Sequence, residues 1–138
     1  MQFASHIKIS ALGALILALL LAASARAEEI VVIVNPASPP LSKDQIADIY
    51  LARINTWTPI DQAVGSLIYT EFYKRATGRD AAQVKAIWSK ILFTGRGVPP
   101  KQLLDSDAVK KAVAANPRAV GYIEKSAVDD SVKVVPLG

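Results

Sequence analysis

The chain has 138 residues, of which 51% are hydrophobic and 20% charged, and its formal net charge is +4 at pH 7. It contains no cysteine, which excludes disulfides, thiolate metal ligands and lipid modification of a cysteine. Its single histidine, His6, stands near the start, so a mature form without the N-terminal segment would lack histidine as well. These two residue types supply most nucleophile–base pairs and metal sites. We therefore expect no catalytic residues, no metal and no cofactor.

The first 27 residues have the three parts of a secretory signal peptide. Lys8 gives the start a positive charge, residues 9–23 form an apolar run, and Ala25-Arg26-Ala27 matches an A-x-A cleavage site. An uncleaved membrane anchor is the alternative, although the run is shorter than the ~20 residues that span a bilayer. We predict cleavage after residue 27, which leaves residues 28–138 as one domain in the periplasm without a lipid anchor.

The first predicted strand ends in a loop with two candidate ligand-binding residues. Residues 29–35 (EIVVIVN) form a continuous Ile/Val run, typical of a strand buried on both faces. Asn35-Pro36 ends the strand, and the loop that leaves the sheet carries Asn35 and Ser38. Because α/β folds place ligands in such strand-end loops, both residues are candidates, and an ordinary turn is the alternative.

The loop that carries Gly65 and Ser66 is the main candidate site. A weak strand over residues 58–62 leads into it, and a helix over residues 67–77 follows. Free backbone N–H groups, a hydroxyl and the positive end of a helix dipole suit a small anion such as phosphate. The alternative is that Ser66 only caps its own helix. We predict that the N–H groups of residues 65 and 66 face water without a partner.

Capping signals mark the predicted helices. Ser42 with Gln45 and Asp80 with Gln83 fit capping boxes that start two of them. The first helix is expected to end near residue 52, and Gly78 fits a stop for the helix over residues 67–77. A fourth helix, capped at residue 105 or 106, is expected to stop at residues 116–117.

Two strands and one arginine-bearing loop complete the predicted elements. The glycine-flanked loop over residues 93–97 carries Arg96, which either closes over an oxyanion or is a surface charge. Residues 119–124 and 131–136 are the strand candidates, and Gly121 indicates close approach by a neighbour or a ligand. The order of the elements predicts an α/β fold with a mixed sheet flanked by about four helices.

Three stretches together resemble the phosphate ABC transporter substrate-binding proteins. They are LSKDQIADIYLARINTW (41–57), GSLIYTEF (65–72) and NPRAVGYIEKSAV (116–128). That family has, in the same order, a Leu-Ser helix that leads to a Trp, a Gly-Ser-Gly-Thr phosphate loop and a Gly-Ala-Ile-Gly-Tyr strand. The resemblance implies a periplasmic-binding-protein fold of type II, here as a shortened, single-lobe relative. It also implies phosphate or another small oxyanion as ligand, and a membrane ABC transporter or a sensor protein as partner.

The match to the phosphate loop is incomplete. Gly65 and Ser66 fit it, but Leu67 stands in place of a Gly, Ile68 in place of a Thr and Gln62 in place of an Arg. A hydrogen bond to a charged group contributes about 1.5–3 kcal/mol, so the resemblance implies weak anion binding by a degenerate site. The two apolar replacements favour the alternative, a periplasmic protein–protein interaction or sensing domain that has lost the ligand.

The charge pattern does not favour nucleic acid as a partner. Lys8 and Arg26 leave with the signal peptide, which lowers the net charge from +4 to +2. The pairs Lys74-Arg75 and Lys110-Lys111 are interpreted as solvated helix faces rather than as a nucleic-acid footprint. We expect neither nucleic-acid binding nor enzymatic activity.

Overall fold

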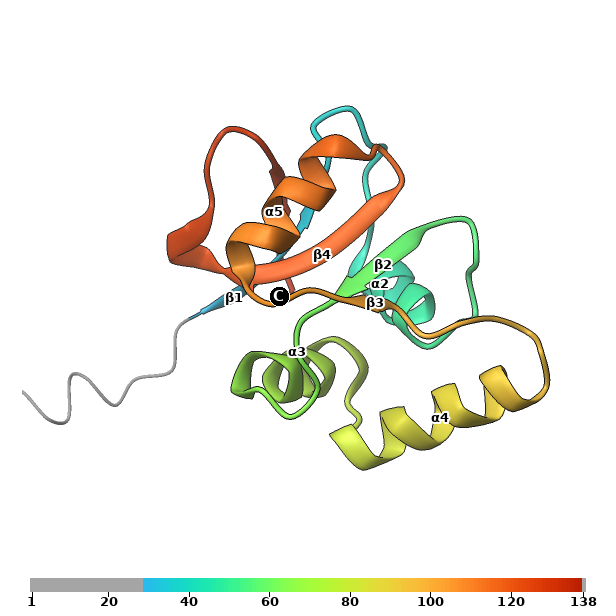
Figure 1. Cartoon of the computed structure of the whole chain (residues 1–138). Coiled ribbons are helices and arrows are strands. Elements are labelled where there is room, and N and C mark those ends of the chain that lie inside the picture. The colour runs from blue at the N-terminus through green and yellow to red at the C-terminus, as the bar shows by residue number, and fades with distance from the viewer. Residues whose placement is uncertain (1–28, 138) are drawn as a thin grey trace, which may run out of the picture.

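The computed structural model describes residues 29–137, so the predicted signal peptide and its cleavage site lie outside the described residues. Figure 1 shows how the elements are arranged. In chain order they are β1 (Ile30–Val34), α2 (Lys43–Tyr50), β2 (Thr58–Asp61), α3 (Leu67–Thr77), α4 (Ala81–Phe93), β3 (Lys101–Gln102), α5 (Ser106–Ala115), β4 (Ala119–Glu124), the 3-10 turn η1 (Lys125–Ala127) and β5 (Lys133–Val135). Within this part of the chain, no helix is both long and apolar enough to cross a membrane.

The five strands form one mixed sheet in the order β3-β2-β4-β1-β5. β2 pairs in parallel with β3 and β4, whereas β1 pairs antiparallel with β4 and β5. The register places Ile30, at the start of β1, opposite Glu124 at the end of β4. The predicted α/β fold, a mixed sheet with four helices, is confirmed.

Helices cover both faces of the sheet, as expected from the Ile/Val run of β1. Successive side chains of a strand point to opposite faces. Val32 and Val34 accordingly pack in the core that α2, α3 and α4 cover, whereas Val31 and Ile33 pack with α5. Figure 1 shows α5 on one side of the sheet and α3 and α4 on the other. All five side chains of β1 are buried, which explains why the strand has no polar face.

Helix α5 lies close to β4 because Gly121 has no side chain. A Cβ atom at this position would lie 2.5 Å from Val109 Cγ1 and 3.2 Å from Val113 Cγ2. Real Cβ atoms do not approach another heavy atom to 2.5 Å, so any larger residue would push the helix away from the sheet. The close approach predicted at this glycine is therefore made by a neighbouring helix.

Local capping signals correctly identified the starts of α2, α4 and α5 and the end of α3. Both predicted capping boxes form, Ser42 with Gln45 and Asp80 with Gln83. Gly78 ends α3 in the left-handed conformation, at a φ of 71°. Of the two candidates for the start of α5, Asp105 is the cap, and its side chain accepts a hydrogen bond from the Ala108 N–H.

The structure differs from the sequence prediction at some element boundaries and in one strand. Helix α2 ends at Tyr50 rather than near residue 52, and β5 covers Lys133–Val135 rather than residues 131–136. The two-residue strand β3 was not predicted, because Lys101 and Gln102 are exposed and polar and have no strand-like pattern. β3 exists because it pairs with β2, whose Ile60 and Asp61 lie opposite it.

Candidate functional site

The topology brings the ends of several elements to one edge of the sheet, here meaning the side at which the carboxyl ends of the parallel strands β2 and β4 lie. Because β2 and β4 are parallel and β1 is antiparallel to β4, Asp61 and Glu124 end their strands at the edge where Ile30 begins β1. Helix α3 begins shortly after β2 ends, and α5 begins shortly after β3 ends. In open α/β sheets, ligands bind outside the carboxyl ends of the parallel strands. This edge, seen in Figure 1 where β2 leads into α3, is therefore the candidate site.

The loop before α3 uses Ser66 to start the helix. The Ser66 hydroxyl donates to Ala63 O at 2.6 Å and accepts from the Tyr69 N–H at 3.4 Å. The Ser66 N–H also donates to Ala63 O, at 3.0 Å. The capping role considered for Ser66 is therefore present, and the prediction that the N–H of residue 66 has no partner is wrong.

Three other backbone N–H groups at the start of α3 remain without a partner among the described residues. The first four N–H groups of a helix have no intrahelical acceptor. Counted from the cap, Ser66 donates to Ala63 O and Tyr69 donates to the Ser66 hydroxyl, which leaves the N–H groups of Leu67 and Ile68. The N–H of Gly65 is also unpaired there, and this exposed residue has a φ of 87° with open space around it. These three donors lie at the positive end of the α3 dipole.

A buried polar cluster supports this loop from inside. The Asp61 carboxylate accepts hydrogen bonds from the hydroxyls of Tyr73 and Tyr122, both at 2.9 Å. The Tyr122 hydroxyl in turn accepts from the Gln62 N–H at 3.1 Å. Tyr122 is held by ring stacking on Phe72, with ring centroids 3.8 Å apart. The backbone at the end of β2 is thus tied to α3 and β4 just before the loop begins.

Gln62 extends the cluster to α5. Its side-chain amide donates to Ser106 Oγ and to Tyr122 O, both at 3.0 Å, and the Ser106 hydroxyl donates to the Glu124 carboxylate. Gln62 stands where the resemblance expects an anion-binding arginine, but here it is buried and its amide is occupied inside the protein. Gln62 therefore does not offer an anion a donor in place of the guanidinium of that arginine.

Burial changes the acidity of the cluster. Desolvation raises the pKa of Asp61 to about 7, although the hydrogen bonds from Tyr73 and Tyr122 act to lower it. Desolvation and the nearby Asp61 charge raise the pKa of both tyrosines far above the usual value. Asp61 also lines a small cavity of about 190 Å³ between α3, α4 and residues 99–102. Sequence analysis missed this cluster because its members come from positions 12 to 61 residues apart, with no local pattern to link them.

Asn35 and Ser38 lie at the opposite edge of the sheet. β1 ends where β4 and β2 begin, whereas Gly65 and Ser66 follow the end of β2. The Asn35 amide donates to the carbonyls of Val113 and Ala114 at the end of α5, and the Ser38 hydroxyl donates to Pro117 O at 2.7 Å. The structure therefore does not bring these two residues to the Gly65–Ser66 loop, and it uses both side chains to attach the β1–α2 loop to the end of α5 and the residues that follow it.

Arg96 lies in the exposed loop after α4. Its Nε donates to Thr94 Oγ1 at 3.4 Å, and its backbone N–H donates to Ile91 O. No hydrogen bond or ion pair in residues 29–137 links its guanidinium to Gly65 or Ser66. In the same part of the chain, no group of three or more His, Cys, Asp or Glu side chains is arranged to hold a metal ion.

Comparison with known proteins identifies similar folds. No protein-family model matches the sequence. The structure is similar to an ABC-type phosphate transport receptor from Vibrio cholerae, at 20% sequence identity and a TM-score of 0.59. It is also similar to a putative phosphate ABC transporter substrate-binding protein with bound phosphate from Clostridium perfringens, at 26% identity and a TM-score of 0.63. A third similar structure is PstS from Borrelia burgdorferi, at 13% identity and a TM-score of 0.52.

The similarity covers most of this chain but less than half of the other proteins. Each comparison covers 78% of this chain, and it covers 45% of the Vibrio cholerae protein, 44% of the Clostridium perfringens protein and 46% of the Borrelia burgdorferi protein. The resemblance to the phosphate substrate-binding proteins is confirmed, and the described domain matches a single-lobe fragment of their fold.

Proposed function

We propose that the protein is a periplasmic binding module, related to the phosphate substrate-binding proteins, that takes a small oxyanion at the start of α3. The observation that carries this proposal is the set of N–H groups of Gly65, Leu67 and Ile68, which have no partner among residues 29–137 and lie at the carboxyl edge of the sheet. Helix starts of this kind bind anions in other proteins. The fold that the chain shares with a Clostridium perfringens protein containing bound phosphate supports the choice of ligand.

Binding is expected to be weak, because backbone groups supply all the donors identified at this edge. A hydrogen bond to a charged group contributes about 1.5–3 kcal/mol, so two such bonds give about 3–6 kcal/mol. A dissociation constant of about 1 mM corresponds to about 4 kcal/mol, so affinity for inorganic phosphate should be around the millimolar range. The helix dipole adds about 0.3–1 kcal/mol at an exposed site.

Export and a membrane partner belong to the same proposal. The signal peptide predicted at residues 1–27 supports export to the periplasm. The similar structures are transport receptors and substrate-binding proteins by name, which supports a membrane ABC transporter or a sensor protein as the partner. Intact-mass analysis of protein secreted from the full-length sequence tests the export step, because cleavage after residue 27 would leave Glu28 as the first residue.

Replacement of Leu67 by proline tests the anion site with little disturbance of the fold. Proline lacks an N–H, and it is favoured at the first position of a helix. The preceding Ser66 has φ −72° and ψ 153°, the extended conformation that a residue before proline adopts. Leu67→Ala is the matched control, because it removes the exposed side chain and keeps the N–H. Both variants are titrated with inorganic phosphate and followed by amide NMR shifts.

We expect phosphate to shift the amide signals of residues 65–68 in the natural protein and in Leu67→Ala, and to bind about tenfold more weakly to Leu67→Pro. The proposal is wrong if millimolar phosphate shifts none of these signals, or if the two variants respond alike. Circular dichroism at matched concentrations confirms that Leu67→Pro keeps the helix content of the natural protein.

An apolar surface beside the loop favours a second candidate function, binding of a protein partner. Val64, Leu67 and Leu92 are 56%, 73% and 54% exposed, and Phe93 at the end of α4 is 93% exposed. Val64 and Leu92 line the same small cavity, which joins the start of α3 to the end of α4. Exposed apolar groups that lie together, as Val64 and Leu92 do at this cavity, mark interaction sites. Residues 81–104 contain four basic residues and no acidic one, so an acidic and apolar partner surface would fit.

A pull-down from periplasmic extract tests this second candidate. A partner should be retained by the natural protein and by Val134→Ser, which changes an exposed apolar side chain on β5, and lost with Leu92→Ser, which changes an exposed side chain of the cavity. Retention that is equal for all three proteins, or absent for all three, contradicts an interaction through this surface.

A further inference from the structure

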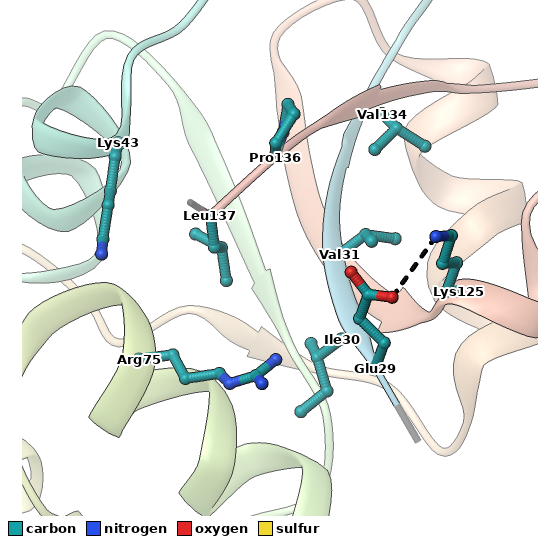
Figure 2. Close-up of a pocket in the computed structure, with 9 residues that line it drawn as sticks. All are labelled: Glu29, Ile30, Val31, Lys43, Arg75, Lys125, Val134, Pro136 and Leu137. Carbon is teal, nitrogen blue, oxygen red and sulfur yellow. Dashed lines mark hydrogen bonds and ion pairs between the residues drawn. The ribbon is translucent and has the colours of Figure 1, made fainter. Parts of the chain in front are cut away.

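A second pocket lies at the other end of α3, between the start of β1, the end of β5 and the first turn of α2. Its volume is about 550 Å³, within the range of small-molecule sites. Ile30 and Leu137, two buried side chains of the same core cluster, form an apolar floor beside Arg75. Figure 2 shows Arg75 extending from α3 between Leu137 and Ile30, with the Glu29–Lys125 pair on the opposite side of the pocket.

The charge around this pocket is mostly positive. Lys43, Arg75 and Lys125 come from α2, α3 and the turn after β4, and Glu29 is the one acidic residue among those described that line the pocket. Glu29 pairs with Lys125, with 3.3 Å between Oε2 and Nζ. Arg75 and Lys43 form no ion pair among residues 29–137. Within this part of the chain, Arg75 and Lys43 therefore line the pocket without a carboxylate as ion-pair partner.

We propose that this pocket binds an organic anion that has an apolar body and one phosphate or carboxylate head group. The head group would pair with Arg75, whose planar guanidinium can donate two parallel hydrogen bonds, and Lys43 would add a second positive charge. The apolar body would cover Ile30 and Leu137. Inorganic phosphate does not fit this description, because it would leave the apolar floor in contact with water.

The pocket is separate from the oxyanion site proposed above. Arg75 lies in the last turn of α3, whereas Gly65, Leu67 and Ile68 lie at its start, about two helical turns away. The two sites also use different donors, since one has side-chain cations over an apolar floor and the other has backbone N–H groups. A ligand at one end can therefore be distinguished from a ligand at the other by point substitutions.

Titration of hexyl phosphate into protein made from the full-length sequence tests the proposal. Amide NMR signals report where the compound binds. Inorganic phosphate and hexanol are the control ligands, because the first has only the head group and the second has the apolar body without the charge. Arg75→Gln removes the proposed head-group partner. Lys74→Gln is the matched control, because Lys74 is the neighbouring exposed cation in the same last turn of α3 and does not line the pocket. Leu67→Pro tests independence from the oxyanion site.

We expect hexyl phosphate to shift the signals of residues 30, 31 and 137 with saturation, and to bind about tenfold more weakly to Arg75→Gln. Lys74→Gln and Leu67→Pro should bind as the natural protein does, and neither inorganic phosphate nor hexanol should saturate these signals. The proposal is overturned if no saturable shift occurs there, if Arg75→Gln and Lys74→Gln behave alike, or if Leu67→Pro abolishes the binding. Binding to phosphatidylglycerol vesicles without binding of soluble hexyl phosphate would also overturn it, because the cations would then serve a membrane surface.

Discussion

Replacement of Asp61 by asparagine should remove a pH dependence of folding stability that is unusual for an aspartate. Burial raises the pKa of Asp61 from 3.8 to about 7 in the folded protein. Between pH 3.8 and about pH 7, Asp61 therefore keeps its proton in the folded state but has lost it in the unfolded state. Stability from this group is fully present below pH 3.8, falls as the pH rises, and is lost above about pH 7.

The size of this effect follows from the pKa difference. One pKa unit corresponds to about 1.4 kcal/mol, so the free energy of unfolding should fall by about 2–3 kcal/mol between about pH 5 and pH 8. That is a large part of the roughly 5–15 kcal/mol that stabilises a typical domain. Histidine is the side chain that ordinarily titrates between pH 5 and pH 8. The only histidine of the sequence is His6, in the predicted signal peptide, so a mature protein would have no histidine titration in this pH range.

Urea unfolding at four pH values from about 5 to 8 measures the effect. The asparagine side chain has nearly the shape of the aspartate but does not titrate, so the Asp61→Asn variant should have nearly constant stability over this range. At the acidic end it should be less stable by about 1–3 kcal/mol, because an amide NH₂ group cannot accept a hydrogen bond from a tyrosine hydroxyl as a carboxyl oxygen does. Asp130→Asn, in the exposed turn before β5, controls for the loss of one carboxylate.

One result would refute the reasoning directly. If the natural protein keeps constant stability or gains stability over this pH range, and Asp61→Asn has the same profile, burial does not raise the pKa of this carboxyl. Carbon NMR of the Asp61 side chain gives an independent check, since the pKa measured in the folded protein should be about 7.

Three further substitutions test the fold and the two edges of the sheet. Gly121→Ala should lower the free energy of unfolding by about 1–3 kcal/mol in urea, because its Cβ would collide with Val109; an unchanged value would contradict the close approach of α5. Asn35→Ala should lower the free energy of unfolding by about 1–3 kcal/mol, because carbonyls at the end of α5 lose their donor, and should not change phosphate affinity. A reduced phosphate affinity would show that Asn35 takes part in phosphate binding. Phe93→Ser should change stability by less than about 0.5 kcal/mol because the ring is exposed, and a larger loss would show that the ring is packed.

The elements that could be predicted from the sequence have local causes. Ser42 and Asp80 each cap a helix together with a glutamine three residues later, so the whole signal lies within one turn. The burial of β1 on both faces is evident in its five consecutive Ile and Val residues. The two-residue β3 has no such signal, because its only cause is the pairing with β2, which lies far away in the sequence and places Ile60 opposite Lys101.

The candidate site was less predictable, because strand direction decides which loops meet. A strand-end loop with Asn35 and a helix start with Gly65 both resemble ligand sites in sequence. Only the antiparallel pairing of β1 with β4 shows that they lie at opposite edges. The cluster around Asp61 depends on the same sheet topology, since Tyr122 reaches Asp61 across 61 residues of chain.

Hydrogen bonds of the buried cluster hold the backbone that leads into the exposed loop, which bears on how the proposed oxyanion site would bind its ligand. Asp61 and Gln62 are held by Tyr73, Tyr122 and Ser106, so the backbone enters the loop in a fixed direction. A rigid loop presents its N–H groups without a further loss of conformational entropy when an anion binds. Rigidity does not add donors, however, and Leu67 and Ile68 contribute only their N–H groups where a hydroxyl is expected from the resemblance. Affinity much tighter than millimolar for phosphate would therefore require further groups beside this edge, and tight binding by this chain alone would show that the backbone donors are not the whole site.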